Sequence, residues 1–324
     1  MIRIRDISLA PEHEAGALLY EAAKALGVSA SEIQKLTIVR RSIDARKKPE
    51  VKVIYTVDAA LKSSENKILK RCRSKRVSAA PVNGYRVPKA RPKEDRPVVI
   101  GFGPAGMFAA LVLALAGRRP IVLERGEDAL TRHQKVEAFW KTGKLDPHSN
   151  VQFGEGGAGT FSDGKLNTGV NNPRIAWILE QFVAAGARED ILFDAKPHVG
   201  TDVLLEVVQN LRRRIISLGG EVRFGCQVEG LVLDGNRLTG VVLTSGEKVS
   251  CTQAVLAIGH SARDTFESLL AQGVPMEPKP FAMGVRIEHR QEAIDAAQYG
   301  RPRGALPPAD YKLVQHLEDG TVYT

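Results

Sequence analysis

Hydrophobic and polar positions follow two periods in the first part of the chain. Residues 14–26 place apolar side chains at helical spacing, and Gly27 follows them as a helix-ending residue. Before and after this segment, apolar and polar residues alternate one by one, which is typical of strands with one buried face. These strands are expected at residues 2–5, 36–39 and 51–57. With a turn capped by Ser29 or Ser31 and a polar, helix-like stretch after the last strand, the pattern predicts a small α+β, ferredoxin-like domain.

From Pro97 the pattern becomes that of an α/β domain. A short apolar strand is expected at 98–100, followed by a glycine-containing turn, a helix at 107–116 and a second strand at 121–124. Strand, helix and strand in this order predict a βαβ unit with a parallel sheet.

Further helices and a series of strands follow this unit. Helices are expected at 175–185 and 201–218, the second with Thr201 or Asp202 as its N-cap and two glycines at its end. Short strands separated by glycine turns come next. They are expected at residues 221–224, 227–233, 238–244, 247–251, 254–258 and 281–288. The strands between 221 and 252 predict a β-meander.

Charge is distributed unevenly along the 324 residues. The net charge is +9, yet residues 1–97 hold 22 Lys and Arg against 11 Asp and Glu, so the basic character belongs to the N-terminal part. A basic run at 67–75 is either a solvated surface or a docking patch for nucleic acid or another acidic partner. Prolines punctuate the following segment, 76–96, which is predicted to be a semi-rigid linker.

Other classes of protein find little support in the composition. No run of about 18 uninterrupted apolar residues is present, and the N-terminus lacks the apolar core of a signal peptide. We therefore expect a cytoplasmic protein without a membrane segment. The cysteines at 72, 226 and 251 lie far apart and form no C-x-x-C, which argues against a disulfide framework, a metal site and a dithiol redox pair.

The glycine turn, Gly101–Gly106, carries the clearest functional signal. It reads G-x-G-x-x-G between an apolar strand and an alanine-rich helix, the context of a dinucleotide-binding fold. Its first glycine permits the tight turn, the second lets a diphosphate approach the backbone, and Gly106 permits close packing of helix and strand. Glu124 ends the next strand, where a carboxylate accepts ribose hydroxyls and disfavours a 2′-phosphate.

A second string, the glycine loop Gly154–Gly159, has the same spacing but a different context. No full strand precedes it, and Thr160–Gly164 cannot begin a helix of the required kind. A second dinucleotide fold is therefore not predicted here. The glycines suit either a loop wrapped on a planar ring or diphosphate, or a flexible surface loop.

Three stretches resemble the glutathione-reductase-type FAD-binding superfamily, and more narrowly a family of uncharacterised bacterial FAD-dependent dehydrogenases with an extra N-terminal domain. They are Val98–Gly126, Gly156–Leu166 and Ala254–Asp264. The resemblance implies an FAD cofactor and adenine contacts from the backbone at Gln227 and Val228. The cofactor-binding residues that it implies, together with those of the glycine turn, are Gly101, Gly103, Pro104, Ala105, Gly106, Glu124, Arg125, Gly157, Thr160, Ser162, Lys165, Val228 and Gly259.

The predicted architecture combines these parts in order. It is an α/β protein in which a Rossmann-like FAD-binding domain at 97–271, with a β-meander inserted at 221–252, follows the α+β domain at 1–75 and the linker. Residues 272–324 are expected to begin a substrate domain. The superfamily's late Gly-Asp motif has no counterpart before Thr324, so a fragment of a longer protein is expected.

A flavin carries hydrides while the protein supplies binding and orientation. We therefore expect an FAD-dependent oxidoreductase acting on an unidentified small molecule. A nucleic-acid-associated flavoprotein and a non-catalytic FAD-binding scaffold remain alternatives. The candidates for acid–base work are His260, Lys165 and Asp163, with His148 and Arg286 as further possibilities.

Overall fold

Contacts divide the chain into two units in the computed structural model, which describes residues 1–81, 84–91, 95–162, 164–166 and 168–323. Unit 1 comprises Met1–Val82, Leu192–Ala195 and Pro280–Thr324, and unit 2 comprises Asn83–Ile191 and Lys196–Lys279. The glycine turn and the glycine loop both belong to unit 2.

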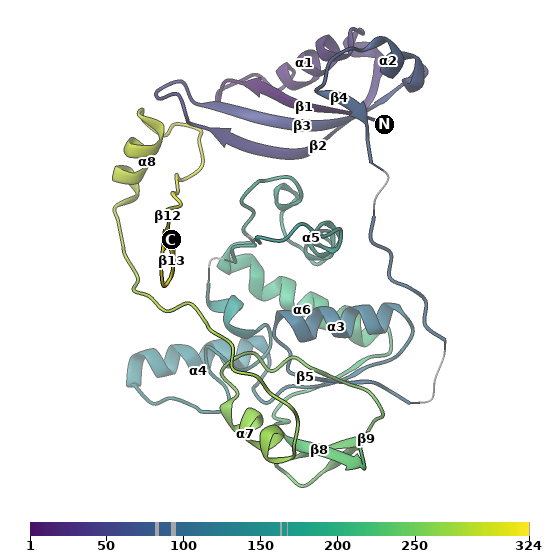
Figure 1. Ribbon diagram of the computed structural model, residues 1–324, viewed down its shortest axis with the longest axis vertical. Helices are drawn as coiled ribbons and strands as arrows, with labels where there is room; N and C mark the ends of the chain where they lie inside the picture. Colours follow the sequence, from purple (N-terminus) through teal and green to yellow (C-terminus); the bar gives the residue numbers. More distant parts are fainter. Residues whose placement is uncertain (82–83, 92–94, 163, 167, 324) are drawn as a thin grey trace. The chain divides into compact units, whose positions relative to one another are not determined.

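Unit 1 contains an antiparallel sheet with strand order β2-β3-β1-β4 and two helices on one face (Figure 1). Alternating residues of the central strand, such as Val57 and Ala59, are fully buried against Ala22 of the first helix. Gly27 ends that helix with φ 64°, as predicted. The elements are β1 (Ile2–Leu9), α1 (Ala17–Leu26), β2 (Ile33–Asp44), β3 (Lys52–Leu61), α2 (Glu65–Arg71) and β4 (Val77–Ala79). This β-α-β-β-α-β order is that of a ferredoxin-like unit.

The end of the chain adds a helix and a hairpin to unit 1: α8 (Gln291–Tyr299), β12 (Val314–Leu317) and β13 (Gly320–Tyr323). The strand predicted at 281–288 is wrong. This segment is extended but forms no ladder with the described parts of the chain, and Phe281, Met283 and Val285 are 82%, 88% and 87% exposed. Its apolar and polar residues do alternate, but a strand also needs a partner strand for its backbone hydrogen bonds.

A parallel sheet with strand order β11-β5-β6-β7 forms the centre of unit 2. Val99 and Val122 point to one face, where they pack in the same buried cluster as residues of the helices. The strands are β5 (Val98–Ile100), β6 (Ile121–Leu123), β7 (Glu221–Arg223) and β11 (Ala254–Leu256), and the covering helices are α3 (Pro104–Leu115), α5 (Arg174–Ala184) and α6 (Thr201–Ser217). An α/β fold with a parallel sheet, as predicted, is therefore confirmed.

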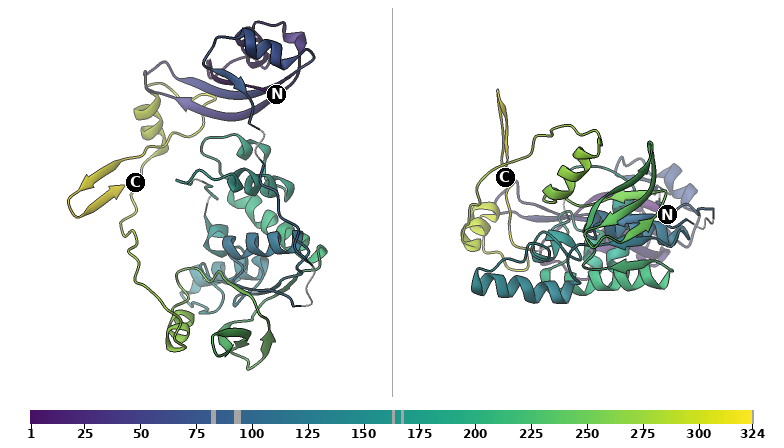
Figure 2. Two further views of the ribbon diagram at one scale, coloured as in Figure 1. Left: turned by 45° about the vertical axis from the view of Figure 1, so that its right-hand side comes forward. Right: turned by 90° about the horizontal axis from the view of Figure 1, so that it is seen from below.

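The opposite face of this sheet packs against a three-stranded antiparallel sheet of order β10-β9-β8 (Figures 1 and 2). Its strands are β8 (Val228–Asp234), β9 (Arg237–Leu243) and β10 (Lys248–Ser250), and α7 (Arg263–Ala271) packs beside β8. The strand at 221–224 was expected to belong to this antiparallel group. In the structure, Glu221–Arg223 instead pairs parallel with β6 and forms an edge strand of the main sheet.

Two helix features bear on the site. The helix α4 (Ala129–Thr142) begins at Asp128, whose carboxylate accepts hydrogen bonds from the backbone N–H groups of Leu130 and Thr131. The N-cap predicted for α6 is wrong: Gly200 with φ 89° occupies that position, and within the described ranges no side chain caps the helix.

None of the helices in the described part of the chain is long and apolar enough to cross a membrane.

Candidate cofactor-binding cavity

A cavity of about 360 Å³ opens at the carboxyl ends of β5, β6 and β11 in unit 2. In open parallel sheets this edge is where ligands bind. The glycine turn, the glycine loop and the start of β8 all contribute to its wall. The residues that the sequence proposed for the site and that line it are Gly101, Gly103, Pro104, Ala105, Glu124, Arg125, Gly157, Val228, Gly259 and His260.

The glycine turn is fixed by sterics. Gly101 has φ +94°, and a Cβ there would lie 2.5 Å from the carbonyl oxygen of Ala257 in the segment after β11. A Cβ on Gly106 would lie 1.9 Å from the carbonyl oxygen of Gly101. Gly106 does not line the cavity; it allows helix α3 to pack directly on the turn, as the motif predicts.

Gly103 has a different reason to be glycine. Its φ of −71° suits any residue, and a Cβ on it would meet nothing nearer than the Cα of Gly157 at 3.8 Å, an ordinary contact. The protein's own packing therefore does not require glycine here. The free space in front of Gly103 belongs to the cavity, and it lies where a dinucleotide's diphosphate would approach the backbone.

Helix α3 points its N-terminus at this space. Gly103 is the N-cap, Pro104 occupies the first turn, and no side chain in the described part of the chain caps the helix. Free backbone N–H groups and the helix dipole favour an anion at such an end. Together with the space at Gly103, this end fits a bound diphosphate.

Glu124 makes more hydrogen bonds to the protein backbone than the sequence suggested. It is 4% exposed, and its carboxylate accepts hydrogen bonds from the backbone N–H groups of Phe102 (2.6 Å), Gly126 (2.9 Å) and Gly154 (2.9 Å). A carboxylate has about four acceptor positions, so one is left after these three bonds, and Glu124 lines the cavity. Glu124 thus joins the glycine turn to the glycine loop in addition to lining the cavity.

The glycine loop lies directly against the glycine turn. A Cβ on Gly157, which has φ +60°, would lie 3.1 Å from the Cδ of Pro104 and 3.2 Å from the Cα of Gly103. The loop then forms a short 3-10 helix, η2 (Gly157–Phe161), instead of an α-helix. The loop is therefore packed against the turn at the cavity wall.

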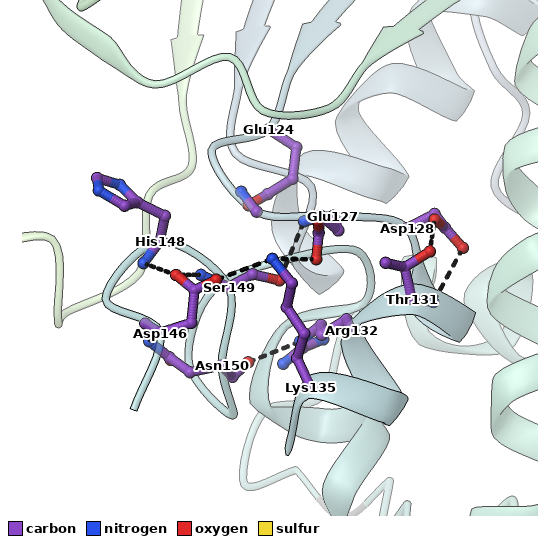
Figure 3. Close-up of polar contacts among 11 residues, drawn as sticks. Glu124, Glu127, Asp128, Thr131, Arg132, Lys135, Asp146, His148, Ser149 and Asn150 are labelled. Carbon is purple, nitrogen blue, oxygen red and sulfur yellow. Dashed lines mark hydrogen bonds and ion pairs between the residues drawn. The ribbon is translucent and has the colours of Figure 1, made fainter. Parts of the chain in front are cut away.

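A buried arginine that the sequence did not point to holds this loop. Arg132 on α4 is fully buried. It donates hydrogen bonds to the carbonyl oxygens of two loop residues and of two residues just before the loop, and to the hydroxyl of Thr160. Figure 3 shows its bond to Asn150. Its guanidinium carbon lies 4.8 Å from the ring centroid of Phe161. Burial lowers the pKa of Arg132 to about 10, against the opposing effect of Glu124 and Glu155, so it remains charged at neutral pH. The carbonyl acceptors are those of Asn150, Val151, Glu155 and Gly157.

The segment before the loop is ordered by a second basic residue of α4. Lys135 lies 2.8 Å from carboxylate oxygens of both Glu127 and Asp146 (Figure 3). Asp146 also accepts the backbone N–H groups of His148 and Ser149. The hydrogen bond from Lys135 holds the pKa of Asp146 below its ordinary value.

Glu155, within the glycine loop, is fully buried, and its charge acts on that of Arg132. One carboxylate oxygen accepts the backbone N–H of Ala129 at 2.8 Å and lies 3.1 Å from the guanidinium of Arg212. Burial raises the pKa of Glu155, although the N–H of Ala129 and the charge of Arg212 oppose that shift. No sequence motif marked Arg132 or Glu155, since neither lies in a recognisable spacing with its partners.

Three other predicted residues of the described chain do not line the cavity. The Thr160 hydroxyl donates to the carbonyl of Gly157, and the Ser162 hydroxyl donates to that of Gly159, so both stabilise the loop itself. Lys165 is exposed and forms an isolated bridge with His198 instead of lining the cavity. Asp163 lies outside the described residues.

The remaining acid–base candidates belong to both units of the chain. His260 is exposed at the cavity. The Nδ1 atom of His148 lies 3.1 Å from the side-chain oxygen of Gln227. Arg286 lies in the irregular, exposed segment of unit 1.

Two known families match the ends of the chain. Residues 1–60 match a domain of unknown function (DUF8436), and residues 280–324 match a family described as "FAD-dependent protein, C-terminal domain-like". Neither match includes the cavity, which lies in unit 2 between them.

Two curated relatives extend over more of the chain. An "Uncharacterized protein" of Clostridium beijerinckii is 46% identical over 98% of this chain and 60% of its own length. The "Probable electron transfer flavoprotein-quinone oxidoreductase YdiS" of Escherichia coli is 26% identical over 58% of this chain and 42% of its own. The chain thus spans about half the length of the curated relatives it matches.

Solved structures give a weaker likeness. That of THI4 from Thermovibrio ammonificans is 19% identical, with a TM-score of 0.36, over 56% of this chain and 64% of that one. A likeness at this level carries no argument about function. The glycine turn, the family match at 280–324 and the flavoprotein relative agree with one another, and all three are features that this chain shares with FAD-dependent proteins.

Proposed function

We propose that the cavity of unit 2 binds FAD and that the chain is the FAD-binding part of an oxidoreductase. The enzyme would transfer a hydride between the flavin and a small-molecule substrate. The observation that carries the proposal is the free space in front of Gly103, at the uncapped N-terminus of α3. Protein packing does not require glycine at that position, whereas a diphosphate does.

The chain's own residues would bind and orient the cofactor. The backbone N–H groups at the start of α3 would hold the diphosphate, with Gly157 packed beside them in the cavity wall. The remaining acceptor position of Glu124 would take a ribose hydroxyl, and the base would extend toward Arg125 and Val228. When bound, the flavin supplies the hydride chemistry.

The reaction class has support outside the cavity. The Escherichia coli relative bears the name of a flavoprotein oxidoreductase, and residues 280–324 match an FAD-dependent family. Rapid flavin reduction or reoxidation by a small molecule would separate an oxidoreductase from a non-catalytic FAD-binding scaffold.

The binding proposal is tested by placing one methyl group in the cavity. Gly103→Ala should fold normally, because its Cβ meets nothing closer than 3.8 Å, but should weaken FAD binding about tenfold or more by obstructing the diphosphate. Gly159→Ala is the matched control, since a Cβ there meets nothing within 4 Å and Gly159 does not line the cavity. FAD affinity, measured by flavin fluorescence, should be unchanged in the control.

Equal affinity for FAD in Gly103→Ala and the parent chain would contradict the proposed position of the diphosphate. A parent chain that neither retains nor binds FAD would contradict the function itself.

Nucleic-acid binding by unit 1 remains a prediction of its basic composition. The exposed residues of the basic run are Lys67, Lys70, Arg71, Arg73 and Lys75. A salt-dependent affinity for RNA that is lost when Lys67, Lys70, Arg73 and Lys75 are replaced by glutamine would support it.

A further inference from the structure

Arg125 directly follows Glu124, the carboxylate proposed to bind the ribose, and lies where the adenine base is proposed to extend. Its guanidinium carbon is 4.3 Å from the ring centroid of Phe153, its side chain is 12% exposed, and it lines the cavity. An arginine in this position beside a ribose is the usual means of binding a 2′-phosphate. The contacts of Arg125 indicate a different use.

Helix α7 fixes Arg125 from one side. The Nη2 atom of Arg125 donates to the carboxylate of Asp264 at 2.9 Å and to the hydroxyl of Thr265 at 3.0 Å. Both acceptors lie in the first turn of α7, where the helix dipole stabilises a carboxylate. The guanidinium is thereby held against Phe153.

Asp264 is itself held by a chain of side-chain hydrogen bonds. Its second oxygen accepts from the Nε2 atom of Gln227 at 2.6 Å. The oxygen of Gln227 must then act as an acceptor, so the Nδ1 atom of His148, 3.1 Å away, carries the proton. This chain fixes both the orientation of the Gln227 amide and the position of the Asp264 carboxylate.

The charges at this end of the cavity do not favour an added phosphate. Partial burial by itself would raise the pKa of Asp264, but the hydrogen bond from Arg125 and the backbone N–H of Thr265 bring it below its ordinary value. Asp264 is therefore ionised at neutral pH. With Glu124 and Asp264 both negative and Arg125 positive, the three residues carry a net charge of −1.

We propose that Asp264 is a specificity residue for the adenosine half of the dinucleotide: by pairing with Arg125 it makes the arginine a stacking surface for the base and withholds it from a 2′-phosphate. This inference rests on the proposed function of the cavity. Arginine guanidinium planes stack well on aromatic rings and bases. The site therefore selects adenosine diphosphates with a free 2′-hydroxyl.

The test compares two ligands that differ by a single phosphate, ADP-ribose and 2′-phospho-ADP-ribose. Their dissociation constants are measured by calorimetry for the 324-residue chain, for Asp264→Ala and for Glu267→Ala. Glu267 is the matched control, because it is an exposed carboxylate on the same helix and does not line the cavity. Removing it changes the net charge equally without freeing Arg125.

We expect the parent chain and Glu267→Ala to prefer ADP-ribose to the same degree. Asp264→Ala should lower this preference about tenfold or more, because a hydrogen bond to a charged group contributes about 1.5–3 kcal/mol. In an Arg125→Met background, the replacement of Asp264 should leave the preference unchanged, since Asp264 acts through the arginine.

An equal preference in Asp264→Ala and Glu267→Ala would overturn the inference while leaving FAD binding intact. A parent chain that binds neither ADP-ribose nor FAD would overturn the proposed function and this inference with it. If Asp264→Ala does not fold, Asp264→Leu makes the same comparison, since it also removes the acceptor for Arg125 and has a side chain of similar length.

Discussion

The glycine turn and the glycine loop have the same G-x-G-x-x-G spacing but are held in place in different ways. The turn joins β5 to α3, and its shape follows from glycines whose missing side chains leave no room for a Cβ, as at Gly101 and Gly106. Among the described residues, no strand directly precedes the loop, and the loop continues into the 3-10 helix η2. It is held by Arg132, a fully buried cation on another helix.

This difference shows what a glycine motif does and does not specify. In the turn, the backbone and its neighbouring strands define the conformation. The loop also needs glycine, since a Cβ on Gly154 or Gly156 would lie 2.4 Å from a neighbouring side-chain atom. Distant side chains hold it in addition: Glu124 through the N–H of Gly154, and Arg132 through the carbonyl groups of Glu155 and Gly157. The stability of the loop should therefore depend on buried charge as well as on side-chain volume.

Replacing the buried arginine should have the largest effect. Arg132→Met would leave buried carbonyl groups without donors and Glu155 without one of its neighbouring cations. A loss of about 3–5 kcal/mol in the free energy of unfolding is expected, as for the removal of one partner from a buried ionic network. Urea denaturation measures it, with Lys141→Met, an exposed basic residue of the same helix, as the control. Equal stability of the two variants would show that the loop does not need the cation.

Adding a methyl group to the turn should have an intermediate effect. In Gly106→Ala the new Cβ would lie 1.9 Å from the carbonyl oxygen of Gly101, so α3 must move away from the turn. Overpacking of this kind costs about 1–3 kcal/mol. Gly159→Ala in the loop should cost less than about 1 kcal/mol, because its Cβ enters open space. Thermal unfolding of the two variants compares them, and a larger loss in Gly159→Ala would reverse the proposed contrast.

Lowering the pH should change the free energy of unfolding by a smaller amount than either substitution above. The pKa of Asp146 is held below its ordinary value by Lys135, so its contribution to stability is present above about pH 4 and is lost as the pH falls through the lowered pKa. Asp146→Asn should be less stable than the parent by about 0.2–1 kcal/mol at about pH 6. The two melting temperatures should converge below about pH 4; a constant difference across this range would assign the effect to packing.

The residues of the site differ in how far the sequence could predict them. Gly101, Gly103 and Glu124 follow from a local motif, since strand, turn and helix are consecutive and their geometry repeats in every such fold. The three backbone hydrogen bonds to Glu124, one of them from Gly154, could not be predicted, because the bond from Gly154 joins segments 30 residues apart. Thr160 and Ser162 were assigned to the cofactor by resemblance, but in the structure their hydroxyls stabilise the loop.

The sequence by itself determined the βαβ unit, the position of the glycine turn and the acidic residue at the end of β6, because each depends on neighbours within a few residues or on a regular hydrophobic period. Only the tertiary structure decided that Arg132 holds the glycine loop, that Asp264 pairs with Arg125, and that Glu221–Arg223 joins the parallel sheet. The reason is physical: these interactions are hydrogen bonds and charge pairs between residues far apart in the chain, and their partners are defined only when the sheet and its helices have packed.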